Sequence, residues 1–148
     1  MKPEEIFIYR NIQKNTEMAI KAIDTLSDKV YEDDFALQIS RQSLKYSDIR
    51  RRAMEKLLAA RAEPVHANYM ADFMLKSAIH INTLLNTSTS HLAELMIQGS
   101  NRGITDMCKS LNHNATEKSM ATELARELMD FEEKNIEAVS YTHLTLPT

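Results

Sequence analysis

Three side chains in this chain have the types and positions that metal binding requires. His91 and Glu94 are three residues apart, so on a helix both would lie on one face. Glu17 lies in the middle of the first long helical pattern. Imidazole and carboxylate groups are ligands for iron, manganese and zinc. His91, Glu94 and Glu17 are therefore the candidates for a mononuclear metal site.

The sequence lacks the ligand set of a di-iron helical bundle. Such a bundle needs inward glutamates on two helices and Glu-x-x-His on the two others. The only Glu-x-x-His runs from Glu63 to His66, and Pro64 places it in a bend. Structural roles for His91, as a cap, and Glu94, as an ion-pair partner, are favoured over metal binding. We predict no cofactor, with iron, manganese or zinc as the alternative.

The sequence contains none of the catalytic motifs considered below. Cys108 is the single cysteine, and no His or Asp has a defined spacing to it. The sequence also contains no phosphate-binding loop, Rossmann fingerprint or nucleophile elbow. These absences disfavour an enzyme without deciding the question.

The elements that would position these residues are helices. Apolar residues recur in steps of three and four from Pro3 to Lys29, and again from the acidic turn at Glu32 to about Ala62. A turn this short makes the two helices antiparallel neighbours. Two further helices are predicted, one from Ser88 or Ser90 to about Asn112 and one that Thr116 caps. The fold class is all-α, a four-helix bundle.

The segment from 62 to 87 is too long for a hairpin turn. Twenty residues of helix span about 30 Å, so the segment can run from one end of the bundle to the other. A helical crossover between the second and third long helices is a ferritin-like feature. Gly99 and Gly103 in the third helix each cost about 1 kcal/mol against alanine, which predicts close packing of another helix there.

The run SHLAELMIQGSNRGITDMCKSLNH, followed by a helix ending in FEEKNIE, carries a family resemblance. It is similar to small ferritin-like four-helix-bundle proteins of anaerobic bacteria, a group without an assigned activity. The most specific part is Ser90-His91-x-Ala93-Glu94 together with Gly99 and Gly103. The resemblance covers residues 1–138 and implies the fold rather than a function.

The last ten residues break the helical pattern. The run VSYTHLTLPT, from Val139 to Thr148, resembles one reading frame of a transposon-end sequencing adapter, a recurrent contaminant of metagenomic assemblies. We therefore expect one helical domain over residues 1–138 and a non-native tail over 139–148 that packs no side chain. On this interpretation the native sequence is cut near Ala138, and its own C-terminus does not follow from the residues given.

Charge and composition restrict the partners. The net charge of −3 gives no overall attraction to nucleic acid or anionic membrane, and no apolar run reaches 18 residues. Seven basic and two acidic residues lie from Arg41 to Arg61, whereas seven acidic and three basic lie from Glu117 to Glu137. We expect these segments to pair across the bundle rather than to bind nucleic acid.

The function predicted from the sequence is that of a non-catalytic, cytoplasmic helical bundle that forms homo-oligomers or binds a protein partner. Nine methionines could fill the core or an adaptable contact surface. The alternative is a metal-binding ferritin-like protein with a redox or storage role, built on His91, Glu94 and Glu17.

Overall fold

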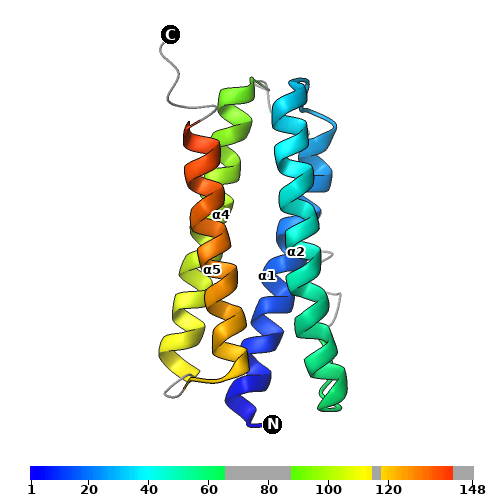
Figure 1. The fold of residues 1–148 in the computed structure, drawn as a ribbon, viewed down its shortest axis with the longest axis vertical. Coiled ribbons are helices and arrows are strands. Elements are labelled where there is room, and N and C mark those ends of the chain that lie inside the picture. The colour runs from blue at the N-terminus through cyan, green and yellow to red at the C-terminus, as the bar shows by residue number, and fades with distance from the viewer. Residues whose placement is uncertain (66–87, 115–117, 142–148) are drawn as a thin grey trace.

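The computed structural model describes residues 1–65, 88–114 and 118–141. These residues form four α-helices and no strand: α1 (Pro3–Ser27), α2 (Asp33–Ala59), α4 (Thr89–Asn114) and α5 (Met120–Val139) (Figure 1). The predicted all-α four-helix architecture is confirmed. None of the helices in these ranges has an apolar stretch of the length and hydropathy that a lipid bilayer requires.

The helices form two hairpins that pack against each other. α1 packs most extensively on α2, and α4 on α5, while α1 also contacts α4 and α5, and α2 contacts α5. In Figure 1, α2 ends at the end of the bundle where α1 begins, whereas α4 begins at the opposite end. The chain between them must therefore join opposite ends of the bundle. The predicted crossover helix falls on residues 66–87, outside the described ranges.

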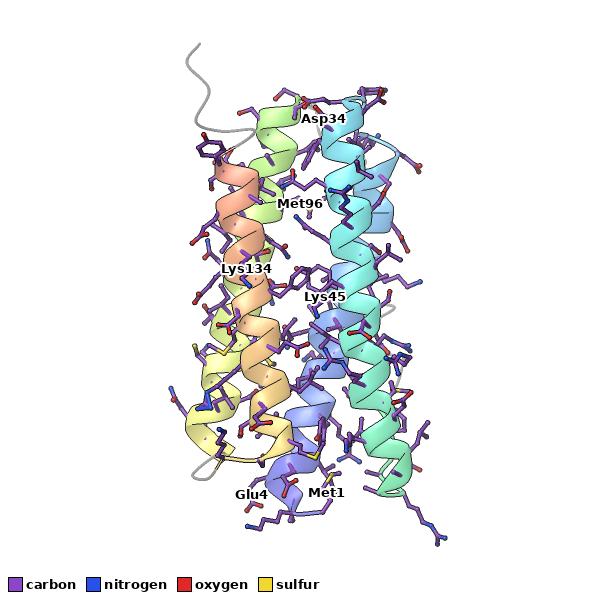
Figure 2. All side chains as sticks on the ribbon, in the orientation of Figure 1. Met1, Glu4, Asp34, Lys45, Met96 and Lys134 are labelled. Atoms are coloured by element: carbon purple, nitrogen blue, oxygen red, sulfur yellow. The ribbon has the colours of Figure 1, made fainter. Side chains whose placement is uncertain are left out.

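The core follows the periodic apolar positions of the first two helices. Side chains from both hairpins fill the space between them (Figure 2). Most positions of the two predicted stripes are buried: Tyr9, Ile12, Thr16, Ile23 and Leu26 of α1, and Phe35, Ile39, Gln42, Tyr46, Ile49, Ala53 and Leu57 of α2. Ala19, Val30 and Ala60, which the same stripes include, are only partly buried. The sequence also predicts an apolar stripe of Met120, Leu124, Leu128 and Phe131 on the last helix. Leu124 and Leu128 are buried, but the prediction is wrong at Met120, which is exposed. The first turn of α5 buries Ala121 instead.

Two helix starts show how local chemistry sets the boundaries. The Ser88 hydroxyl accepts a hydrogen bond from the His91 N–H at 3.3 Å, as expected for a cap of α4. The N-cap of α5 is Ser119 rather than the predicted Thr116, which lies outside the described residues. The Ser119 and Thr122 side chains each accept from the other residue's N–H, at 3.2 and 2.8 Å. This reciprocal capping box satisfies two backbone donors at the helix start.

The structure corrects the expectation that the last ten residues pack no side chain. Val139 is the final residue of α5 and is fully buried in the core. It continues the periodicity of Leu128 and Asn135, which lie on the same buried face. The described helix therefore extends one residue into the segment that resembles an adapter.

α2 ends in a Schellman motif with an unusual residue at its left-handed position. The Arg61 N–H donates to the Leu58 carbonyl at 3.0 Å, and the Ala62 N–H donates to the Leu57 carbonyl at 2.9 Å. Arg61 has φ 55°, a conformation in which glycine usually sits because it has no Cβ. The left-handed backbone conformation of Arg61 is therefore less favourable than it would be with glycine at this position.

We expect Arg61→Gly to stabilise the fold by about 1 kcal/mol, because the left-handed conformation costs an ordinary residue roughly 1–2 kcal/mol and glycine little. Urea denaturation of the wild type, Arg61→Gly and Arg61→Ala measures this. Arg61→Ala is the control for loss of the guanidinium, and a glycine variant no more stable than the alanine variant would contradict the expectation.

Candidate functional site

Glu17, one of the three predicted metal ligands, is engaged by protein groups. Its carboxylate accepts hydrogen bonds from the Arg50 Nε at 2.8 Å and from the Gln13 Nε2 at 3.0 Å. The Gln13 amide oxygen in turn accepts from the Val65 N–H at 2.9 Å. Glu17 thus joins α1 to α2, next to the point where the chain leaves α2.

His91 and Glu94, the other two predicted ligands, lie in the first two turns of α4. The His91 Nδ1 is 3.9 Å from a Glu94 carboxylate oxygen, and both side chains are partly exposed. Across the described ranges, no three His, Cys, Asp or Glu side chains gather where they could hold a metal ion. The structure brings His91 to Glu94 and does not bring Glu17 to that pair.

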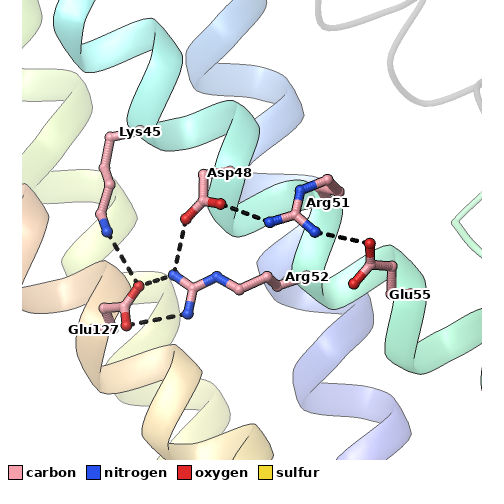
Figure 3. Close-up of polar contacts among 6 residues, drawn as sticks. All are labelled: Lys45, Asp48, Arg51, Arg52, Glu55 and Glu127. Atoms are coloured by element: carbon pink, nitrogen blue, oxygen red, sulfur yellow. Dashed lines mark hydrogen bonds and ion pairs between the residues drawn. The ribbon is translucent and has the colours of Figure 1, made fainter.

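The predicted charge pairing across the bundle is confirmed between α2 and α5. Arg52 and Lys45 of α2 both donate to the Glu127 carboxylate of α5, the lysine at 3.4 Å (Figure 3). Arg52 also contacts Asp48 at 3.2 Å. The hydrogen bond from Arg52 holds the pKa of Glu127 below its usual range. The basic segment of α2 is thus partly used inside the molecule.

A buried carboxyl is the most unusual chemical feature of the interior. Glu132 of α5 is only 4% exposed. The hydroxyls of Tyr46 of α2 and Ser100 of α4 hydrogen-bond with it, and the Asn135 Nδ2 donates to the Tyr46 hydroxyl at 3.3 Å. Tyr46 also packs edge-on against Phe131, with ring centroids 4.9 Å apart. Three helices therefore meet at one carboxyl group.

Glu132 is one of the acids from Glu117 to Glu137 that the sequence places on a solvated face, and for Glu132 that prediction is wrong. A usable signal was present, because Ala121, Ala125, Leu128 and Glu132 continue one stripe in steps of four and three. Charged residues are rarely fully buried, so the prediction followed the charge of Glu132 rather than its position on the apolar stripe.

Burial changes the acidity of this carboxyl. Loss of hydration raises the pKa of Glu132 to about 7, and the hydrogen bonds from Tyr46 and Ser100 only partly oppose the rise. Among the described groups no lysine or arginine acts on it. Burial and the negative charge of Glu132 also raise the pKa of Tyr46 well above its usual value. The carboxyl therefore changes its charge near neutral pH.

Gly103 of α4 provides the space that Glu132 occupies. A Cβ at this position would lie 2.9 Å from a carboxylate oxygen of Glu132, closer than real contacts allow. The tight approach predicted for Gly103 is therefore present, but the neighbour is a side chain of α5 rather than a helix backbone. At Gly99 the predicted close packing is wrong. A Cβ built on Gly99 would have no heavy atom of the described neighbouring residues within 4 Å.

Gln42 adds a second polar group to the interior of α2. It lies one turn before Tyr46 on the same buried face and is 4% exposed. Neither its amide nitrogen nor its amide oxygen has a hydrogen-bond partner in the described structure. A buried unsatisfied group of this kind costs about 1–3 kcal/mol. Leucine in place of Gln42 would therefore stabilise the fold, because it has no polar group to leave unpaired in the centre of the bundle.

The outer face of α2 shows the opposite anomaly, because it carries exposed leucines. Leu37, Leu44 and Leu58 are 52%, 73% and 62% exposed. Their spacing in multiples of seven places them along one line, on the side of α2 opposite its buried residues. Arg51 fills the remaining position of the line and pairs with Asp48 and Glu55, both at 2.8 Å (Figure 3). We call Leu37, Leu44, Arg51 and Leu58 the leucine stripe.

The sequence analysis followed only the stripe that faces the core, so it missed this one. The seven-residue spacing of the three leucines was visible in the sequence. Comparison of the chain with protein-family models, with curated proteins and with solved structures gives no match. Its function is therefore inferred from its own geometry.

The buried carboxyl predicts a specific pH dependence of stability. The folded-state pKa of about 7 lies above the usual value of 4.5, so the native state binds more protons between these values. The stabilisation is complete below about pH 4.5 and is lost as the pH rises through 7, a loss of roughly 3 kcal/mol. Glu132→Gln stays neutral, so it should match the wild type at pH 5 and exceed it at pH 8.

Chemical denaturation from pH 5 to 8 measures this difference. The exposed neighbouring acid Glu133 provides a matched control, because Glu133→Gln removes a charge of the same sign without the burial. Parallel stability curves for the wild type and Glu132→Gln would contradict the buried-carboxyl interpretation.

The two glycines of α4 should respond differently to alanine. Gly99→Ala should stabilise the fold by up to about 1 kcal/mol, since the helix gains propensity in open space. Gly103→Ala forces Glu132 to move, and Gly103→Leu overpacks the site at a cost of typically 1–3 kcal/mol. Thermal denaturation of the three variants ranks them. A Gly103→Leu protein as stable as Gly99→Ala would show that Glu132 yields easily.

Proposed function

We propose that the chain is a ferritin-like bundle in which the connection between α2 and α4 crosses the length of the molecule. The support is the order of helix directions, in which α2 and α4 run the same way and the other two run oppositely (Figure 1). Two antiparallel hairpins joined by one long connection have this topology. The resemblance carried by residues 90–113 and 131–137 agrees with it.

We further propose that the protein is a non-catalytic bundle that self-associates through the leucine stripe. The observation that supports this is the alignment of Leu37, Leu44 and Leu58 on one exposed face. Single exposed leucines are common on protein surfaces, whereas an aligned apolar row marks a contact surface. Each leucine gains about 1.5–3 kcal/mol on full burial, which is enough for three of them to support association.

The non-catalytic part of the proposal rests on where the reactive groups lie. Glu132 has a pKa suited to proton transfer, but its burial keeps it out of reach of a substrate. Glu17 is bound by Arg50 and Gln13. Glu17 and Glu132 thus serve to hold helices together.

Self-association should depend on Leu44. Wild-type protein should increase in mass with concentration in size-exclusion chromatography with light scattering, and Leu44→Lys should remain monomeric over the same range. Lysine at a position 73% exposed leaves the monomer core intact, so the melting temperature of dilute protein should be unchanged. Phe7→Lys, a change of an exposed aromatic residue on α1, is the matched control and should associate as the wild type does.

A wild type that stays monomeric at all concentrations would refute self-association. Equal loss of association in Phe7→Lys and Leu44→Lys would refute the role of the stripe, because it would show a general effect of added charge.

A further inference from the structure

The two ends of α2 carry opposite charges. Its first turn and N-cap hold Glu32, Asp33 and Asp34, all exposed. Its C-terminal end holds Lys56, which contacts Met120 of α5 at 3.6 Å, and then Arg61 and Glu63, so this end has a net charge of only +1. This order suits the dipole of the helix itself. It also makes the helix complementary to a second copy that runs antiparallel, whereas a parallel copy would bring like charges together.

The leucine stripe has the same internal symmetry. Leu37 and Leu58 are equally distant from the midpoint between Ser47 and Asp48, and so are Leu44 and Arg51. If two copies of α2 pair antiparallel about that midpoint, Leu37 of one copy meets Leu58 of the other. Leu44 then packs on the aliphatic stem of Arg51, whose guanidinium is held aside by Asp48 and Glu55.

The flank of the stripe is complementary in this register as well. Arg41 and Glu55 are both exposed and lie on the same edge of the stripe. The antiparallel arrangement brings Arg41 of each copy to within about one residue of the level of Glu55 of the other. Two such pairs form by symmetry, one on each side of the axis, which is the property of an isologous two-fold contact.

We propose that the occupant of the leucine stripe is the same stripe of a second copy, paired antiparallel about a two-fold axis at Ser47 and Asp48. This inference rests on the proposed function and adds the partner, the register and the direction. The stripe from Leu37 to Leu58 is about 32 Å long. A contact made by one helix face per copy is small for a stable interface, so the dimer should be reversible and dependent on concentration.

Cysteine cross-linking tests the register. In a Cys108→Ser background, Ser47→Cys lies beside its own copy across the axis and should form a disulfide-linked dimer under mild oxidation. Ser40→Cys is the matched control, since it is exposed on the same edge of the same helix. Antiparallel pairing separates it from its own copy by about 22 Å along the axis, so it should not cross-link with itself. In a parallel dimer each position would lie level with its own copy, so the two variants would cross-link to the same extent.

Charge reversal tests the flank. Arg41→Glu and Glu55→Arg should each weaken dimerisation at least about fivefold, because each reversal affects two symmetric pairs. The double variant should return to within about threefold of the wild-type dissociation constant, as expected for coupled residues. Two single reversals whose effects simply add in the double variant would overturn the predicted pairing of Arg41 with Glu55.

The outcomes separate this inference from the proposed function. A dimer by light scattering in which Ser47→Cys fails to cross-link overturns the two-fold register and leaves self-association standing. A strictly monomeric wild type overturns both. If Leu44→Lys lowers the melting temperature of the monomer, a segment of the same chain covers the stripe, and the second copy is the wrong occupant.

Discussion

Burial of the Glu132 carboxyl constrains the way the two hairpins fit together. A carboxyl removed from water needs hydrogen-bond donors, and here they come from Tyr46 of α2 and Ser100 of α4. Gly103 must be small for the side chain to fit. A slip of one hairpin by a single turn, about 5.4 Å, would separate the carboxyl from the Tyr46 hydroxyl and leave it only Ser100 of its own hairpin. Apolar stripes alone tolerate such slips, so this contact helps to fix one register.

The faces of α2 make three different kinds of contact, with the core, with α5 and with solvent. Tyr46 and Gln42 face the bundle centre, Arg52 and Lys45 reach Glu127 of α5, and the leucine stripe faces outward. Arg51 and Arg52 are neighbours in sequence, yet Arg51 pairs with Asp48 and Glu55 of its own helix while Arg52 reaches across to Glu127 of α5 (Figure 3). One helix can thus hold the fold together and still present a contact surface.

Polar groups inside and leucines outside reverse the usual distribution along part of α2. Buried Gln42 of α2 and buried Glu132 of α5 lower the free energy of unfolding. This is consistent with selection for one helix register rather than for maximal stability. The exposed leucines gain nothing in the isolated monomer. Their alignment becomes favourable only when a second apolar surface covers them, which is why association is the function we propose.

The sequence by itself determined the four helices, the antiparallel hairpins, a serine cap at Ser88 or Ser90, and the pairing of basic α2 with acidic α5. The helices, the hairpins and the cap follow from residues close together in the chain, through helical periodicity and turn length, and the α2–α5 pairing follows from the opposite charges of the two segments. The burial of Glu132, the different surroundings of Gly99 and Gly103, and the packing of Val139 were decided only by tertiary structure. Periodicity shows which face of a helix turns inward, but the groups that meet across the core depend on the register between helices that are distant in sequence.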